Sequence, residues 1–255
     1  MMRLTFVLAL LAPLTLWPAR AEPVADVAVD CRSADAHIEH NFALQKVASA
    51  IAAKHLSILV VGAGSSLLPG SSGASHAYPA RLQVALQQKL PGVEVKLATD
   101  VKPKRTAKEM MKAMAAAIGP NKPALVIWQT GTVDAMQGID PDQFSQALDK
   151  GIAIARSAGS DVIFINPQYS PRTESMIALG TYAENMRWVA LQQDVPLFDR
   201  FSIMKLWSDN GTFDLNSATK KLDMAERVHD CIGRLVADLV LESAKIGAPQ
   251  TDGGR

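Results

Sequence analysis

The sequence predicts an α/β fold with three layers, α/β/α, in which helices cover both faces of a central five-stranded, mostly parallel sheet. Two observations predict this fold. Short apolar runs rich in β-branched residues alternate along the chain with longer stretches whose apolar residues recur at helical spacing. The 255 residues are also 48% hydrophobic and 20% charged, an ordinary globular composition that can bury one sizeable core. Such an alternation favours right-handed crossovers between parallel strands.

Five short apolar segments are expected to form the strands. They lie at residues 58–61, 93–97, 124–128, 162–165 and 195–198. Short apolar runs of this kind are typical of strands that are buried on both faces, as in a parallel sheet. The binding site of such a sheet lies beyond the carboxyl ends of its strands. The residues that follow these segments are therefore the candidates for function.

The helices are expected between the strands and after the last one. Their ranges are 78–90, 106–118, 141 to beyond 152, about 174–192 and about 224–243. Asp140 and Pro141 form a good helix start, because aspartate caps the first turn and proline fits its first position. In the last helix, an apolar stripe that includes Val228, Cys231 and Leu235 is expected to face the sheet.

The first 21 residues have the features of a secretory signal peptide. Arg3 precedes a short apolar run, and Ala19-Arg20-Ala21 is a small-x-small cleavage site. An uncleaved N-terminal anchor is the alternative. We expect a single domain over residues 22–246, a disordered tail over 247–255, and no membrane span after cleavage, because no second apolar run is long enough. The mature protein is then periplasmic or secreted.

Two cysteines, Cys31 and Cys231, lie near opposite ends of the mature chain. In an oxidising compartment an even pair favours a disulfide, and two separate buried thiols are the alternative. Neither cysteine has a metal-like spacing and the histidines are scattered, so no metal site is expected. The net charge of +1 gives no strong field, so nucleic acid is not an expected partner.

The first predicted strand is followed by the segment Gly62-Ala63-Gly64-Ser65-Ser66-Leu67. One interpretation is a dinucleotide-binding loop, but the third glycine of that motif is absent. We therefore expect no nucleotide cofactor, and no other cofactor is indicated.

A second interpretation rests on a family resemblance. The segment 64–67 resembles the Gly-Asp-Ser-Leu nucleophile block of the SGNH (GDSL-like) ester hydrolases, in some of which serine replaces the aspartate. Three further segments are similar to the same family, at residues 77–82, 128–134 and 167–171. The last of these, together with Cys31 and Cys231, resembles a bacterial exported branch. The resemblance covers nearly the whole mature chain and implies a flavodoxin-like fold of the SGNH hydrolase type.

The same resemblance implies that most of the catalytic side chains are replaced. The family needs a serine, a histidine that activates it, an aspartate that orients the histidine, and an oxyanion hole that includes a glycine and an asparagine. Carried over residue by residue, only the serine is kept, as Ser66. Lys104 stands at the glycine position, Val133 at the asparagine, Lys220 at the aspartate and Asp223 at the histidine. The chain is thus expected to be a degenerate member of the family.

Other groups could supply the missing base. His229 is expected inside the last helix and away from the strand ends, whereas His76 follows the serine block and could approach the site. A serine–lysine arrangement with Lys104, Lys220 or Lys221 is a further alternative. For Asp223, an ion pair with Lys220 is favoured over a role as base, because a carboxylate is a weak base for a hydroxyl.

The favoured hypothesis is a catalytically impaired, exported SGNH-like protein that binds a small anionic or acylated envelope ligand or a partner protein. Two alternatives remain: an active ester hydrolase or acyltransferase that uses Ser66 with an atypical base, and a purely structural partner protein. The lysines that replace family residues predict a cationic cleft. The candidate ligand-binding residues are Ser65, Lys104, Asp134, Gln168 and Lys220.

Overall fold

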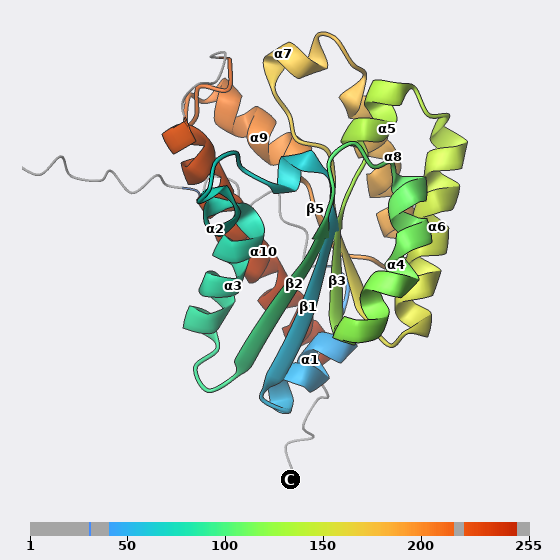
Figure 1. Cartoon of the computed structure of the whole chain (residues 1–255), viewed down its shortest axis with the longest axis vertical. Helices are drawn as coiled ribbons and strands as arrows, with labels where there is room; N and C mark the ends of the chain where they lie inside the picture. Colours follow the sequence, from blue (N-terminus) through green and yellow to red (C-terminus); the bar gives the residue numbers. More distant parts are fainter. Residues whose placement is uncertain (1–30, 32–40, 217–221, 249–255) are drawn as a thin grey trace, which may run out of the picture.

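The computed structural model describes residue 31, residues 41–216 and residues 222–248. The predicted signal peptide, Lys220, Lys221 and residues 249–255 lie outside this part of the chain. Figure 1 shows the elements in chain order.

The sheet has five strands in the order β2-β1-β3-β4-β5, and every neighbouring pair is parallel. The strands are β1 His55–Gly62, β2 Glu94–Val101, β3 Leu125–Gln129, β4 Asp161–Ile165 and β5 Leu197–Phe198. Each coincides with a segment expected from the sequence, so the predicted fold class is confirmed. β1 and β2 are longer than their apolar runs, because the pairing between them continues through polar residues such as Ser57 and Asp100.

The five predicted helices are present, although the fourth begins at Leu179 and not near residue 174, and several shorter ones accompany them. The helices are α1 Gln45–Ala52, α2 Gly73–His76, α3 Tyr78–Lys89, α4 Ala107–Asn121, α5 Thr132–Gln137, α6 Pro141–Ser157, α7 Pro171–Glu174, α8 Leu179–Gln192, α9 Arg200–Asp209 and α10 Leu222–Gly247, with a single 3-10 turn, η2, at Gly64–Ser66. Asp140 caps α6 as predicted, accepting the amides of Asp142 and Gln143 at 3.1 Å. Of the helices in the described part, none is both long and apolar enough to cross a bilayer.

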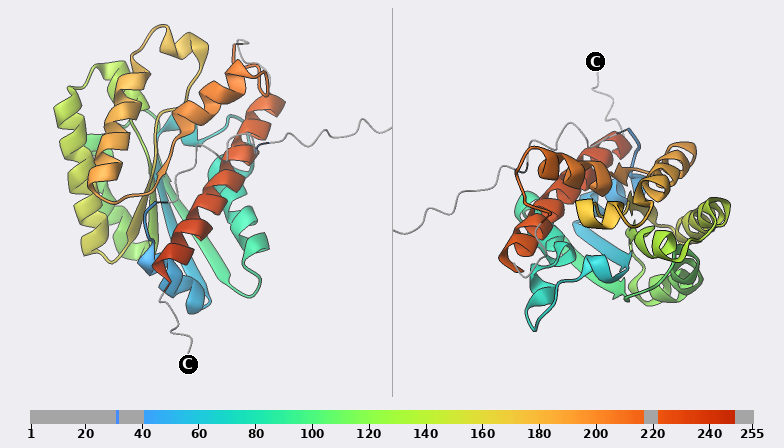
Figure 2. Two further views of the ribbon diagram at one scale, coloured as in Figure 1. Left: turned by 180° about the vertical axis from the view of Figure 1, so that it is seen from behind. Right: turned by 90° about the horizontal axis from the view of Figure 1, so that it is seen from above.

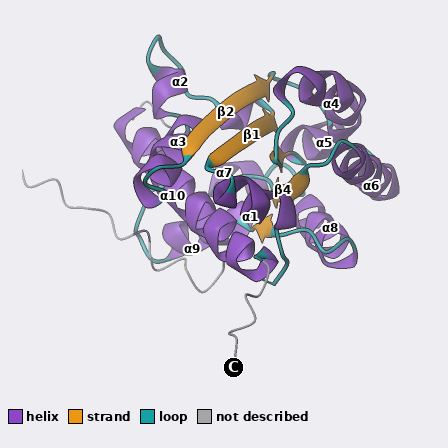
Figure 3. Cartoon of the chain, turned by 90° about the horizontal axis from the view of Figure 1, so that it is seen from below, coloured by secondary structure: helices purple, strands orange, loops and turns teal. Residues whose placement is uncertain are grey.

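The helices form two layers, one on each face of the sheet. The helices α1, α3, α9 and α10 lie on one face and α4, α6 and α8 on the other (Figures 1 and 3). Alternate residues of β1 enter the two cores: Ile58 and Val60 pack in the first, and Leu59 and Val61 in the second. Burial of both faces is the reason the strands are continuous apolar runs in the sequence.

The long helix α10 runs diagonally across its face of the sheet, beside α3 (Figure 2). Gly233 allows this close approach, because a Cβ there would lie 2.6 Å from Cβ of Arg81 and 2.8 Å from the amide nitrogen of Leu82. The helix therefore packs against the start of α3 and brings its own first turns to the carboxyl edge of the sheet.

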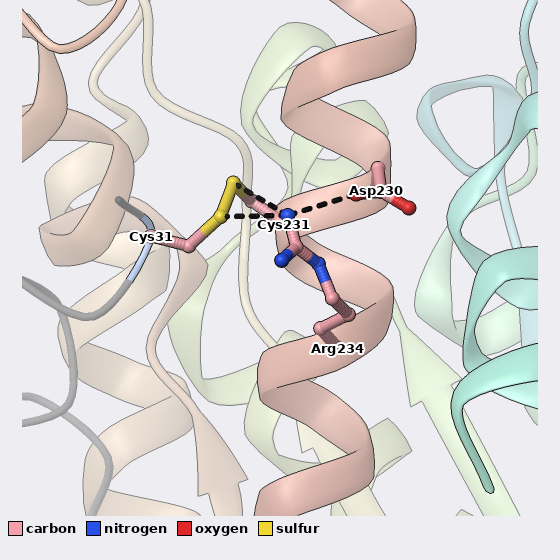
Figure 4. The surroundings of a disulfide bond; sticks show 4 residues. All are labelled: Cys31, Asp230, Cys231 and Arg234. Carbon is pink, nitrogen blue, oxygen red and sulfur yellow. Dashed lines mark hydrogen bonds and ion pairs between the residues drawn. A yellow bond between two sulfur atoms is a disulfide. The ribbon is translucent and has the colours of Figure 1, made fainter. Parts of the chain in front are cut away.

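A disulfide joins Cys31 to Cys231 on α10, with a Cα–Cα distance of 5.6 Å, as the sequence predicts. Arg234 lies beside it: one guanidinium nitrogen is 3.2 Å from the sulfur of Cys31 and 2.8 Å from a carboxylate oxygen of Asp230 (Figure 4). The bridge closes a separation of 200 residues. In the loop-entropy description such a closure contributes about 5 kcal/mol by restricting the unfolded chain.

Candidate functional site

The segments that follow β1, β3 and β4 meet at the carboxyl edge of the sheet, where α2, α5 and α7 also lie (Figure 1). The turn η2 follows β1 directly and carries both serines of the nucleophile-like block. Gln129 is the last residue of β3, and Gln168 follows β4. This edge is the place that a parallel sheet offers for a site.

Ser66 is fully buried, with 0% of its surface exposed. Its hydroxyl donates a short hydrogen bond to Oε1 of Gln129 and lies 3.5 Å from the hydroxyl oxygen of Tyr78. Burial raises the pKa of Tyr78 to about 12, so this phenol stays protonated. A Cβ at position 62 would collide with the Ser66 hydroxyl, so the glycine at the end of β1 leaves room for it. The expected nucleophile is thus held inside the protein.

Ser65 has the opposite placement. It is half-buried, its hydroxyl accepts a short hydrogen bond from Nε2 of Gln129, and its carbonyl accepts one from Arg200 at 3.2 Å. Ser65 lines a cavity of about 640 Å³, which we call the Ser65 cavity. The buried Gln129 side chain therefore bridges the two serines, with its amide nitrogen on one and its oxygen on the other.

The Ser65 cavity brings together several residues expected from the sequence. Lys104, Val133 and Gln168 all line it. Val133 offers no hydrogen-bond donor where the family has an asparagine. Lys104 is exposed and has a positive φ of 64°. The other expected cation of the cleft, Lys220, lies outside the described residues.

His229 also lines the Ser65 cavity, which corrects the expectation that it lies away from the strand ends. The residue is 5% exposed, and Nδ1 of its ring accepts the amide N–H of Tyr78 at 2.9 Å. Burial, helped by the positive charge of Arg200, lowers the pKa of His229 to about 3. The ring is therefore neutral with its proton on Nε2, and it is a hydrogen-bond donor rather than a base.

His76 has a different partner. Its Nδ1 lies 2.7 Å from a carboxylate oxygen of Glu226 on α10, and both side chains are about one-third exposed. In the described part of the chain, His76 is not among the residues that line the Ser65 cavity. Two histidines thus lie near the first turns of α10, and neither is hydrogen-bonded to a described serine.

Asp134 and Asp223, the two aspartates that the sequence suggested as site residues, are not part of the Ser65 cavity lining. Asp134 is buried, and its carboxylate accepts the amide of Ala107 at 3.0 and 3.1 Å, where it holds the N-terminus of α4. Burial raises the pKa of Asp134, although these backbone hydrogen bonds oppose the shift. Asp223 is exposed in the first turn of α10. Neither carboxylate is among the described residues that line the Ser65 cavity.

A second cavity of about 310 Å³ adjoins the first, and Gln168, Ala225 and His229 line both. We call it the Arg200 cavity, after the arginine at the start of α9. Arg200 is only 1% exposed and donates to Oε1 of Gln168 at 3.2 Å. Sequence reasoning missed this residue. The available signal was a basic residue two positions after the last predicted strand, in the segment Phe198-Asp199-Arg200-Phe201.

Comparisons with known proteins agree with this architecture. The model of the non-GDSL lipase-like family matches residues 30–246. Among solved structures, TesA is 21% identical, with 71% of this chain and 99% of TesA covered at a TM-score of 0.56. A lipase/acylhydrolase from Enterococcus faecalis is 18% identical (72% and 94% covered, TM-score 0.58). A catalytic mutant of Axe2, an acetylxylan esterase from Geobacillus stearothermophilus, is 13% identical (72% and 93% covered, TM-score 0.57). No curated protein matches by sequence.

Proposed function

This chain belongs to the non-GDSL lipase-like family, and from that premise we propose that it binds a small acylated ligand in the Ser65 cavity without ordinary serine-catalysed ester hydrolysis. The observation that carries the proposal is the placement of Ser66. Its hydroxyl is buried and hydrogen-bonded to Gln129, on the side of η2 that faces the core. An acyl carbon in the cavity would meet Ser65 instead.

The base and the oxyanion hole are also weakened. Ordinary serine hydrolases need an imidazole whose free lone pair faces the hydroxyl. The lone pair of His229 is occupied by the amide of Tyr78. Loss of the base costs about 10⁶ in rate in the serine-protease template, and loss of one oxyanion donor, as at Val133, costs roughly 10²–10³. Either loss is enough to disable an ordinary esterase.

The cavity itself supports binding of an acyl group. Leu67, Leu68, Val133 and Met136 form apolar walls, and the side chains of Ser65 and Gln168 add a few polar groups. Binding sites for small molecules are commonly mostly apolar with a small number of polar anchors. Two solved proteins of similar fold are a lipase/acylhydrolase and an acetylxylan esterase, which fits a ligand with an acyl group.

The proposal includes an extracytoplasmic location, periplasmic or secreted. The Cys31–Cys231 disulfide supports it, because disulfides persist in oxidising compartments. An envelope ligand with an acyl chain would be available there.

A second candidate function is acyl transfer through Ser65. The observation in its favour is that Ser65 lines the cavity and that Gln129 orients its hydroxyl. A base is the weak part of this candidate. Lys104 lines the same cavity but is exposed, whereas a lysine that acts as a base is normally desolvated.

Labelling and turnover test these functions together. The mature protein, Ser65→Ala and Ser66→Ala are incubated with a fluorophosphonate probe and with p-nitrophenyl acetate and butyrate, beside an active SGNH esterase. We expect neither labelling nor turnover above background, together with saturable binding of a short fatty acid measured by calorimetry. Turnover lost only in Ser65→Ala would establish the second candidate. Turnover lost only in Ser66→Ala would establish conventional hydrolysis and refute the proposal.

A further inference from the structure

Arg200 is a buried cation whose hydrogen-bond partners are neutral. Its guanidinium donates to the carbonyl of Ser65 and to Oε1 of Gln168, both at 3.2 Å. Its Nε is buried without a hydrogen-bond partner among the described residues. Two other arginines that are at least partly buried, Arg105 and Arg187, each form an ion pair with a carboxylate at 2.8 Å. Arg200 thus lacks, within the described chain, the counter-ion that its counterparts have.

The charge on Arg200 is maintained despite burial. Burial lowers the pKa of Arg200 to about 10, which still leaves the guanidinium protonated at neutral pH. A buried charge without a counter-ion is unfavourable, and folded proteins normally pair such groups. The folded protein therefore gains if an anion enters the Arg200 cavity, which Arg200 lines.

The other polar groups around Arg200 also favour a negative ligand. His229 lines both cavities and carries its proton on Nε2, because Nδ1 accepts the amide of Tyr78. Gln168 faces Arg200 with its amide oxygen, which leaves its NH₂ group as a donor. No Asp or Glu is among the described residues that line either cavity. A carboxylate would meet donors there and no charge of its own sign.

We propose that the Arg200 cavity binds the carboxylate group of the ligand, with Arg200 as its counter-ion and the acyl chain in the adjoining Ser65 cavity. This inference rests on the proposed function and names its ligand class: small acyl carboxylates. It places the anion site at Arg200 rather than at the lysines of the predicted cationic cleft. A second arginine, Arg172, also lines the Arg200 cavity, but it is exposed and its charge is solvated. Arg200 is therefore the buried charge that needs a counter-ion, and one buried positive charge is balanced better by a carboxylate than by a phosphate dianion.

Binding of matched ligands tests the inference in the wild-type protein. Octanoate, octanamide and octyl phosphate have the same chain and differ in the charge of the head group. Each is titrated by calorimetry into the mature protein with its disulfide intact. We expect octanoate to bind at least tenfold more tightly than octanamide and more tightly than octyl phosphate. The preference for octanoate over octanamide should be the same at pH 6.5 and pH 8, since neither of these ligands, nor His229, nor Arg200 changes charge in that range. Octyl phosphate is compared at pH 8, where its head group is a dianion.

Substitutions test whether Arg200 is the source of the preference for octanoate over octanamide. In Arg200→Met the octanoate-to-octanamide ratio should fall to about one, whereas Arg200→Lys, which keeps the charge, should retain part of it. Arg227→Met is the matched control: it removes the same charge from an exposed position on α10, next to the cavity residue Val228, and should keep the wild-type ratio. Circular dichroism verifies that each variant is folded. The wild-type comparison stands even where a variant does not fold.

The outcomes separate this inference from the proposed function. Equal binding of octanoate and octanamide by the wild-type protein overturns the inference and leaves an acyl-binding protein. An equal loss of preference in Arg227→Met overturns the assignment to Arg200. Binding of none of the three ligands overturns both. Ester turnover through Ser66 overturns the proposed function alone, because the octanoate preference would persist.

Discussion

Ser65 and Ser66 are neighbours in the chain and occupy opposite environments. Ser66 lies in the core side of η2, where Gln129 and Tyr78 surround its hydroxyl. Ser65 lines the cavity, its hydroxyl accepts from the Gln129 amide and its carbonyl accepts from Arg200. A single turn of 3-10 helix is enough to separate them, because successive side chains in such a turn point in different directions.

The contrast continues in the polar groups behind each serine. On the core side, the hydroxyl, the amide oxygen of Gln129 and the phenol of Tyr78 satisfy one another, as buried polar groups normally do. On the cavity side, Arg200 and His229 present donors that have no charged partner among the described residues. The core side is therefore complete in the protein alone, and the cavity side has the composition of a binding site.

The largest expected effect that tests this contrast is the pH dependence of the free energy of unfolding that His229 causes. This residue lies between the two environments. The pKa of His229 is lowered from 6.5 to about 3 in the folded protein. Between these two pH values the imidazole is therefore protonated in the unfolded chain and neutral in the folded one. The contribution of the neutral ring to the free energy of unfolding is fully present above pH 6.5 and is lost as the pH falls toward 3. The difference amounts to about 3–5 kcal/mol, at up to about 1.4 kcal/mol per pH unit. Urea unfolding at pH 7, 5, 4 and 3 measures it.

His229→Gln is the matched control for this titration. Its amide oxygen can accept the Tyr78 amide, and it takes up no proton in the same window. The wild-type protein should lose more stability than the variant between pH 6.5 and 3. Parallel curves for the two proteins would mean that the imidazole is accessible to protons in the folded state, and the assignment of a neutral donor would then be wrong.

A smaller effect is expected at Gly62, which makes room for the Ser66 hydroxyl. Gly62→Ala places a methyl group against that oxygen and should cost about 1–3 kcal/mol as overpacking. In a Ser66→Ala background the cost should fall below about 1 kcal/mol, since the oxygen is gone. Gly64→Ala is the control, because the nearest atoms to its Cβ are at 3.9 Å. Equal costs in both backgrounds would show that Ser66 points elsewhere.

Most of the fold could be predicted from the sequence because the apolar pattern is strong where both faces of a strand are buried. The strand β1, with Leu56 to Val61 in two cores, is the clearest case. The helices that the sequence did not reveal have weaker signals. The helices α2 and α5 have four and six residues, too few for a helical period, and α9 is separated from β5 by a single residue, its cap Asp199.

The site was predicted less well because a motif gives residue types without their direction. The block 64–67 locates η2, but the orientation of its two serines depends on Gly62, Gln129 and Tyr78 from three other elements. The position of His229 depends on the length of α10 and on its packing against α3. Arg200 belongs to no motif of the resemblance, so only its burial beside the cavities reveals it.

The smallest expected effect compares the two serines directly. Ser66→Ala leaves the buried oxygen of Gln129 without its donor and should cost about 1–2 kcal/mol in the free energy of unfolding. Ser65→Ala should change it by no more than about 0.5 kcal/mol, because water in the cavity can accept from the Gln129 amide instead. Urea unfolding at pH 7 measures both.

Gln129→Met allows double-mutant cycles that separate the lost hydrogen bond from the effect of making each serine side chain smaller. It removes the shared partner, so the cost of Ser66→Ala should shrink in that background, and the coupling between positions 66 and 129 should exceed that between 65 and 129. The reverse order of couplings would place Ser65 in the core and Ser66 in the cavity. Such a result would return position 66 to the role of a nucleophile and remove the main reason to regard the protein as a binder.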